Sequence, residues 1–338
     1  MSINELTFGC EFEIFMPVGM ARATLAQMIT NAGVTCGEMR YGHVTPVAWK
    51  ITTDGSLGDY NRGAEIVSPV LRGDEGFRQV QVVLDTARGA GCTVHRSCGF
   101  HVHVGAQGQP LDFFKRLAKL YAAYEAVLDT LLAPSRRGPR GGNGYCRSVT
   151  INQTMLDSAA DMRTVTSAVN SADRYCKLNL TAYFRHGTVE FRHHQGTVDS
   201  AKAIHWIKLC LRMVLRAKAQ TAGMPAATNA PLRAGRDRWL NTVVEMLLRP
   251  EGTTRAEVMA VTGQRGARLP RRTRAANLIV VRRRRNGEVR FYARRPDVAS
   301  ATDAALPITL DGLMQLIGAD ATEWTFFSRR AAAFGTAA

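Results

Sequence analysis

Residues Thr7–Phe15 read TFGCEFEIF, and this stretch sets the character of the fold. Its polarity alternates, which predicts a β-strand, because successive side chains of a strand point to opposite faces. One face of this strand carries only apolar residues, which are Phe8, Cys10, Phe12 and Ile14. The other face carries Glu11 and Glu13. We therefore expect a strand that buries one face in a core and presents two carboxylates on the other.

The chain around this strand predicts further strands interleaved with a few helices. Strands are expected at 47–53, 63–70, 93–104, 175–182 and 187–193, the last two forming a hairpin. Helices are expected at 21–32, 73–90, 111–132 and 200–219. Asp54-Gly55-Ser56 reads as a turn, and 134–144 as an irregular basic loop. Because strands and helices do not alternate regularly, the pattern favours an α+β fold with a mostly antiparallel sheet.

The composition is that of a globular protein with a real core. The chain has 338 residues, 46% of them hydrophobic and 21% charged, and no apolar run long enough to span a membrane. The first residues, MSINELTFGC, lack the pattern of a signal peptide. The seven cysteines are odd in number and form no C-x-x-C pair, which argues against a disulfide framework and a cysteine zinc site. We expect a cytoplasmic protein.

The chain divides into four parts by composition. Residues 1–220 form the first domain, and 221–235, TAGMPAATNAPLRAG, read as a linker. Residues 236–296 form a small basic domain, and 297–338 are a tail with no assigned role apart from an expected helix at 310–317.

Each strand of the first domain carries polar residues that have an ordinary explanation. Glu11 and Glu13 suit a solvated strand face, and the two histidines of CGFHVHVG suit a half-buried strand. Asp54 suits a turn, Glu65 an edge strand, and the pair Glu190 and Arg192 an ion pair within one strand. Taken together these side chains line one face of a single sheet. A face rich in carboxylates suits Mg²⁺ or Mn²⁺, whereas zinc needs more nitrogen and sulfur ligands.

Six motifs, in this order along the chain, resemble the amidoligase family, a branch of the glutamine synthetase-like carboxylate–amine ligases. The motifs are FGCEFEIF, WKITTDGSLG, GAEIVSPVLRG, CGFHVHVG, YCKLNL and GTVEFRHHQGTVD. The resemblance covers residues from about 7 to about 216. It implies a funnel-shaped active site on an antiparallel sheet, with ATP entering one end and divalent metals among the acids.

The resemblance also implies roles for individual residues. Glu11, Glu13, Glu65, His101 and Glu190 match metal-ligand positions. His103 and Arg192 match positions near the nucleotide phosphates, with His101 expected closer to the metals. Asp54 matches a position near the acceptor or a metal. Arg147 and Lys177 are assigned to phosphate or carboxylate from charge and position alone.

The chemistry that the family implies needs such residues. A carboxylate is a poor electrophile, so ATP converts it to an acyl phosphate before an amine attacks. Metal ions and Arg192 would neutralise the transferring phosphoryl group. The implied cofactors are ATP and Mg²⁺ or Mn²⁺, and the implied substrates are a small-molecule or peptide carboxylate and an amine.

The basic domain resembles a winged helix-turn-helix module. Between residues 232 and 295 there are 17 arginines, no lysine and 5 acidic residues. RPEGTTRAEVMAVTG matches the start of such a module, with a capping box of Thr254 and Glu257 before a helix at 255–261. Asn286-Gly287 between two strand-like runs predicts a hairpin, and Pro270 departs from the expected pattern.

A basic module of this kind favours a nucleic-acid partner. The residues expected to face it are Arg268, Arg271, Arg272, Arg274, Arg282, Arg283, Arg284, Arg285 and Arg290. The ordinary alternative is a solvated basic surface on a module that contacts protein.

Two other functions fit the sequence. One is a DNA-binding regulator whose ligase-like domain senses a small molecule without turnover; the intact acidic and histidine positions argue against it. The other is phosphoryl transfer that stops at a phosphorylated product. We take ATP-dependent amide formation as the leading hypothesis.

Overall fold

We analysed a computed structural model of the chain. The structure describes residues 2–40, 42, 45–59, 61–138, 144–219, 246, 253–262, 279–285, 288–294 and 308–335. Among these residues, no helix combines the length and apolar character needed to cross a membrane.

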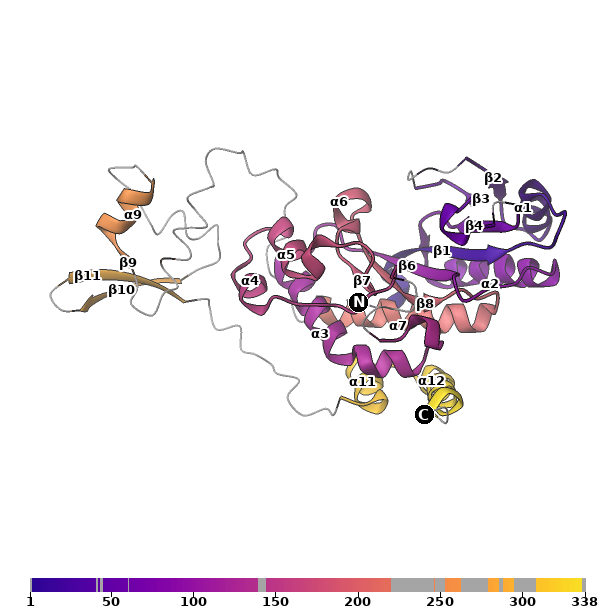
Figure 1. The fold of residues 1–338 in the computed structure, drawn as a ribbon. Helices are drawn as coiled ribbons and strands as arrows, with labels where there is room; N and C mark the ends of the chain where they lie inside the picture. The colour runs from indigo at the N-terminus through magenta and orange to yellow at the C-terminus, as the bar shows by residue number, and fades with distance from the viewer. Residues whose placement is uncertain are drawn as a thin grey trace.

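An eight-stranded sheet forms the centre of the first domain (Figure 1). Its strands are β1 (Thr7–Phe15), β2 (Cys36–Glu38), β3 (Trp49–Thr52), β4 (Gly63–Val67), β5 (Leu71–Arg72), β6 (Gly99–Gly105), β7 (Leu178–Asn179) and β8 (Thr188–Gln195). The order is β2-β3-β4-β1-β6-β8-β7, with β5 beside the start of β1. Among the described strands of this sheet, β2 and β3 form the one parallel pair. The predicted α+β fold with a mostly antiparallel sheet is therefore confirmed.

The two faces of β1 differ as its sequence predicts. Phe8, Cys10, Phe12 and Ile14 are all at most 2% exposed and belong to one hydrophobic core. Phe12 stacks on Phe100 of β6 with ring centroids 4.4 Å apart. Because burial of large apolar side chains is the main driving force for folding, this face fixes how β1 lies in the domain.

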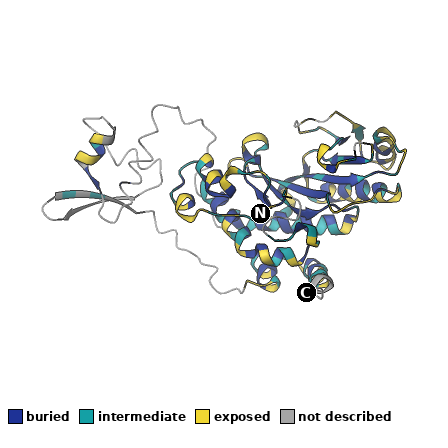
Figure 2. Cartoon of the chain, viewed as in Figure 1, coloured by how far each residue is buried: buried dark blue, intermediate teal, exposed yellow. Residues whose placement is uncertain are grey.

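Helices cover the apolar face of the sheet. The long ones are α1 (Arg22–Asn31), α2 (Gly73–Gly89), α3 (Leu111–Thr130) and α7 (Ser200–Ala219). Phe77 of α2 stacks on Phe8, and Trp206 of α7 lies against His194 of β8. Buried residues gather between the sheet and these helices (Figure 2). Shorter helices are α4 (Gln153–Ser158), α5 (Met162–Ala168) and α6 (Ala182–His186).

Most predicted elements are present, but the predicted strand at 175–182 is largely wrong. Only Leu178–Asn179 pairs with β8, and helix α6 follows at once. The Asn179 side chain accepts hydrogen bonds from the Thr181 backbone N–H and hydroxyl (2.8 and 2.7 Å), which turns the chain out of the strand. Strands expected at 47–53, 63–70 and 93–104 are shorter than predicted, and β2, α4 and α5 were not predicted.

A second, three-stranded sheet belongs to the basic region. It consists of β9 (Thr253–Thr254), β10 (Ile279–Arg285) and β11 (Glu288–Arg294) in the order β10-β11-β9, with helix α9 at Arg255–Thr262. The predicted capping box is confirmed, because Thr254 and Glu257 exchange hydrogen bonds of 2.8 and 3.2 Å. The predicted hairpin strands are also confirmed. The predicted recognition helix, with Arg268, Arg271, Arg272 and Arg274, lies outside the described residues, so the winged helix-turn-helix stays a prediction.

The C-terminal helices α11 (Leu310–Leu316) and α12 (Ala321–Gly335) pack on the first domain, beside α3 (Figure 1). Leu313 and Phe327 are at most 3% exposed and belong to its core. Arg212 of α7 pairs with Glu323 at 2.5 Å, and Phe326 stacks on His205 of α7. The part of the tail that the structure describes is therefore a third layer over the helices.

We expect Phe327→Ala to lower the free energy of unfolding of the whole chain by about 3–5 kcal/mol, because it leaves a cavity in the shared core. Chemical denaturation followed by tryptophan fluorescence would measure this. The exposed Thr325 on the same helix provides the control, since Thr325→Ala should cost less than about 0.5 kcal/mol. Equal effects of the two variants would mean that α12 does not stabilise the domain.

Candidate active site

Three neighbouring strands bring the predicted acidic and histidine residues together. Glu11 of β1 lies opposite His101 of β6, and His103 of β6 lies opposite Glu190 of β8. Since side chains two apart on a strand share a face, His101 and His103 both point to the face that carries Glu11. The predicted common orientation of the two histidines is therefore confirmed.

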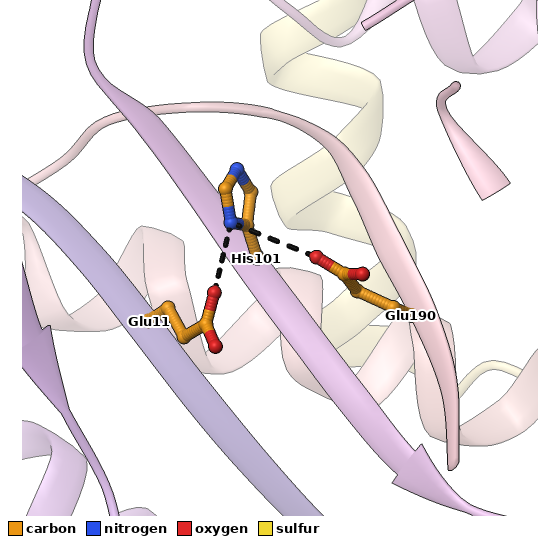
Figure 3. A group of neighbouring side chains, drawn as sticks. All are labelled: Glu11, His101 and Glu190. Carbon is orange, nitrogen blue, oxygen red and sulfur yellow. Dashed lines mark hydrogen bonds and ion pairs between the residues drawn. The ribbon is translucent and has the colours of Figure 1, made fainter. Parts of the chain in front are cut away.

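Glu11, His101 and Glu190 form the tightest group (Figure 3). His101 Nδ1 lies 3.1 Å from Glu11 Oε2 and 3.7 Å from Glu190 Oε1. One ligand atom from each of the three residues lies within 4.8 Å of the others. Glu190 and His101 are each 4% exposed, whereas the Glu11 side chain is 29% exposed, so two members of the group are buried and the third is open to solvent.

His103 lies two residues after His101 on β6 and adjoins this group. Its Nε2 lies 3.5 Å from Glu11 Oε1 and 3.8 Å from Glu190 Oε1. Its Nδ1 lies 2.9 Å from the hydroxyl of Thr188, which fixes the orientation of the ring. His103 therefore sits on the outer side of the three-residue group.

Glu190 is also held by two polar neighbours. Arg192 Nη1 lies 2.5 Å from Glu190 Oε1, and Asn179 Nδ2 donates to Glu190 Oε2 at 2.6 Å. The ordinary interpretation of an ion pair between Glu190 and Arg192 is thus part of the geometry, but the pair faces the same cavity as the histidines.

Glu13, Glu65 and Asp54 extend the acidic surface toward β4. Glu13 lies directly opposite Glu65, and Glu13 Oε2 accepts the Gly99 N–H at 2.6 Å. Asp54 Oδ1 accepts the Ser56 N–H at 2.7 Å, so Asp54 does form the predicted turn. Like charges opposed on adjacent strands destabilise a sheet unless a cation lies between them.

Burial and neighbouring charges act together on the pKa values of these carboxylates. Burial would raise the pKa of Glu11, but hydrogen bonds with His101 and His103 hold it well below the ordinary value. Burial would also raise the pKa of Glu190, which Arg192 and the histidines lower. Burial raises the pKa of Glu65, and the negative charges of Glu11 and Asp54 raise it further. Carboxylates with pKa values pushed apart in one cleft are typical of functional sites.

All these side chains line one cavity of about 1300 Å³. Pockets for a single drug-sized ligand measure about 300–1000 Å³, so the cavity has room for a nucleotide and a second substrate. Its wall adds several cations and aromatic residues to the acidic floor: Lys50, Arg136, Arg174, Arg185, Tyr145 and Tyr175.

The donor set fits a hard divalent cation. Two carboxylates and one imidazole within 4.8 Å are ligands that Mn²⁺ accepts readily and Mg²⁺ accepts when waters complete its shell. Zinc in a protein site usually takes three or four nitrogen and sulfur ligands, which this group does not offer.

Comparison with known proteins assigns the family. Residues 4–214 match the family described as "Putative amidoligase enzyme". The chain belongs to the amidoligase family. This is the family that the six motifs predict. The match ends at residue 214, so it does not include the basic region.

Two solved structures resemble this amidoligase chain, each at 13% identity. A complex of GmaS with ADP aligns with 98% of this chain and 67% of that chain, at a TM-score of 0.39. A bifunctional glutathione synthetase from Pasteurella multocida aligns with 98% of this chain and 52% of that chain, at a TM-score of 0.34. None of the curated proteins matches the amidoligase chain.

Two predicted contacts of the amidoligase site disagree with the geometry. Lys177 is fully buried, and its Nζ lies 2.9 Å from Glu125 and 2.7 Å from Asp129 of α3. Arg147 pairs with Asp173, and neither Arg147 nor Lys177 lines the cavity. Both cations thus have carboxylate partners outside the cavity, which is why charge and position in the sequence misplaced them.

The structure adds residues that the sequence did not single out. Asn179 orients Glu190 through a hydrogen bond. In the sequence, its place in the YCKLNL motif was the feature that could have pointed to it. Thr188 orients His103 and lies two residues before Glu190 on the same face of β8. Arg136 lines the cavity from the basic loop after α3, where no periodic pattern could mark it.

Below the amidoligase site, a buried network makes stability depend on pH. His193 lies 2.6 Å from both the Tyr121 hydroxyl and Asp129 Oδ1. Burial lowers the pKa of His193 to about 4. Burial would raise the pKa of Asp129, but hydrogen bonds from His193 and Lys177 lower it to about 2.

We expect the free energy of unfolding to fall as the pH falls from 6.5 to 4. In that window His193 binds a proton in the unfolded chain but not in the folded one, which costs up to about 1.4 kcal/mol per pH unit. Asp129 adds a loss below its ordinary value of 3.8, as the pH falls toward about 2. Urea denaturation at several pH values would measure the slope. The slope should be shallower in His193→Asn, and an unchanged slope would contradict the assignment.

Proposed function

We propose that this chain forms an amide bond between a carboxylate and an amine through an acyl-phosphate intermediate made from ATP. The observation that carries the proposal is the group Glu11, His101 and Glu190 on the floor of a large cavity whose wall carries arginines. The acidic floor suits divalent cations, and the basic wall suits phosphate groups.

Two cation positions follow from the donor set. Glu11, His101 and Glu190 would hold one ion, and the opposed carboxylates Glu13 and Glu65 would hold another. Bound Mg²⁺ or Mn²⁺ would supply positive charge to the β- and γ-phosphates of ATP.

The reaction then proceeds in two steps. A carboxylate oxygen of the substrate attacks the γ-phosphorus, and the bond from that phosphorus to the β,γ-bridging oxygen breaks, so ADP leaves. The amine next attacks the acyl carbon, and inorganic phosphate leaves with the electrons of the C–O bond. Arg192 stabilises the negative charge in the first step, with His103 beside it. In our proposal Asp54, on the cavity wall, accepts the proton that the amine loses.

The test is a survey of ATP turnover over a panel of carboxylates and amines. Wild-type protein with Mg²⁺ should release ADP and phosphate in equal amounts, and mass spectrometry should find the amide, 18 Da lighter than the two substrates together. Chelation by EDTA should abolish turnover and added Mg²⁺ should restore it. A product that is heavier by one phosphoryl group would instead support phosphoryl transfer without ligation.

A ligand-sensing regulator is the main alternative class. Such a protein would bind ATP without turnover across the whole panel. The arrangement of Glu190 between Arg192 and Asn179 favours the enzyme, because a site that only binds does not need a carboxylate held at 2.5 and 2.6 Å by two donors inside a metal-binding group.

We further propose that the basic region binds nucleic acid. In the β10–β11 ribbon, Arg283 lies directly opposite Arg290, within a run of four arginines at Arg282, Arg283, Arg284 and Arg285. A strand with this density of arginines in its sequence suits a polyanion such as nucleic acid.

Titration with duplex DNA tests this second function. Binding should weaken steeply between 50 and 200 mM salt, because phosphate contacts release counterions. Replacing Arg283 and Arg290 by glutamine should weaken binding and reduce the salt dependence. Absence of binding at the lowest salt would refute the proposal and leave the ligase unaffected.

A further inference from the structure

Arg136 is a buried cation with no carboxylate partner. Arg136 is 2% exposed, and it forms no ion pair within the part of the chain that the structure describes. Its Nη2 donates to the Ser97 carbonyl at 3.3 Å, and its guanidinium contacts the Cys146 thiol. Its Nε has no hydrogen-bond partner. A guanidinium carries five N–H donors, so most of the capacity of Arg136 is unused.

Arg136 also borders the active-site cavity. A Cβ placed on Gly99 would stand 2.7 Å from His101 Nε2, 2.9 Å from Arg136 Nη2 and 3.4 Å from Glu13 Oε1. The guanidinium therefore borders a small gap beside His101 and Glu13, which only a glycine at position 99 leaves open.

Arg192 is a second guanidinium on the same cavity wall. Its Nε also lacks a partner, although its Nη1 pairs with Glu190. Cys146 connects the two arginines, since its Sγ donates to the Arg192 carbonyl at 3.4 Å while its thiol contacts Arg136. Burying a charge without a partner is costly, so a cavity wall that buries Arg136 without an ion pair, near Arg192, suits an anion.

The number of charges distinguishes between the anions of the reaction. A substrate carboxylate carries one negative charge, and one arginine compensates it. The transferring phosphoryl group carries more charge, spread over three equatorial oxygens. Two arginines, each able to donate more than one N–H, match the phosphoryl group better.

We propose that Arg136 binds the γ-phosphoryl group of ATP together with Arg192 and stabilises it during transfer to the substrate carboxylate. This inference rests on the proposed acyl-phosphate mechanism. Arg136 donates N–H groups to the non-bridging oxygens while the substrate oxygen bonds to phosphorus and ADP leaves. No proton moves to or from Arg136 in this step.

Nucleotide binding to the full chain in Mg²⁺ tests the proposal without knowledge of the acceptor. We expect Arg136→Gln to weaken binding of AMP-PNP, which carries a γ-phosphate, by about tenfold or more in isothermal titration calorimetry. The affinity for ADP should change by less than about twofold, which also shows that the site is still folded. Arg136→Lys, which keeps the charge but loses the planar fork, should fall in between.

The exposed Arg96 provides a matched control, because it lies in the loop before β6 and does not line the cavity. Arg96→Gln should bind both nucleotides as the wild type does. Equal losses of AMP-PNP and ADP affinity in Arg136→Gln would assign Arg136 to the fold or to the diphosphate and overturn the proposal. Unchanged AMP-PNP affinity, with weaker binding of the carboxylate substrate, would also overturn it. If the wild type bound neither nucleotide, the ATP-dependent function itself would fail.

Discussion

Replacement of Glu190 by glutamine will lower kcat for ATP-dependent amide formation by about a thousandfold or more. The amide has the same shape as the carboxylate but loses the charge that pairs with Arg192 at 2.5 Å and lies 3.7 Å from His101. Arg192 would lose its fixed orientation, and the proposed cation would lose one of its three protein ligands. Removal of a single charge-stabilising donor from an active site costs about 10²–10³ in kcat, and here two effects act together. Coupled measurement of ADP release gives the rate.

The control for this variant is Glu75→Gln, on the exposed surface of α2, where Glu75 pairs with Arg78. Its kcat should equal that of the wild type. Both variants should have wild-type circular dichroism. If Glu190→Gln kept more than about a tenth of the wild-type kcat, Glu190 would not belong to the catalytic group, and the assignment of the cation site would have to move elsewhere in the cavity.

Replacement of Lys177 by methionine will lower the free energy of unfolding by about 3–5 kcal/mol. Lys177 is fully buried between Glu125 and Asp129, and these carboxylates in turn accept the backbone N–H groups of Val149 and Gly138. Removing one partner of a buried ion pair leaves the other charges in a medium of low dielectric, which costs this much. Loss of the charge would therefore affect α3 and also the segments around Gly138 and Val149, whose backbone N–H groups bond to these carboxylates.

Lys119 of the same helix provides the matched control for Lys177. Lys119 pairs with Asp157 at 2.9 Å, but both side chains are about half exposed. Lys119→Met should cost less than about 1 kcal/mol, because exposed ion pairs contribute little. Urea denaturation of the two variants gives the comparison. A cost below about 1 kcal/mol for Lys177→Met would show that the buried pair is neutral for stability.

Much of the fold and of the site could be predicted from alternation alone. Thr7–Phe15 shows which side chains are buried, and the period of two in CGFHVHVG places both histidines on the face of Glu11. These inferences succeed because a strand offers its side chains only two directions. The family resemblance assigned Glu190 to the same site, and the structure places Glu190 of β8 directly opposite His103.

Other contacts depend on distances that no local pattern records. Lys177 looks like a substrate-binding cation in sequence, yet helix α3, some 50 residues earlier, supplies its two carboxylates. Arg136 stands in a loop rich in glycine and arginine, where nothing in the sequence distinguishes the buried Arg136 from the half-buried Arg137 beside it. The strand predicted at 175–182 ends early because the Asn179 side chain accepts a hydrogen bond from the Thr181 backbone N–H.

The position of α11 and α12 changes how the basic region is connected to the enzyme. Helix α7, which ends at Ala219, and helix α11, which begins at Leu310, both contribute to the core of the first domain, so in the sequence the basic region is an insertion into that domain and not a C-terminal appendage. A chain cut after residue 220 would lack the layer that covers α3 and would expose an apolar surface to solvent. The excision that keeps the ligase intact is an internal one, in which a short linker joins α7 directly to α11.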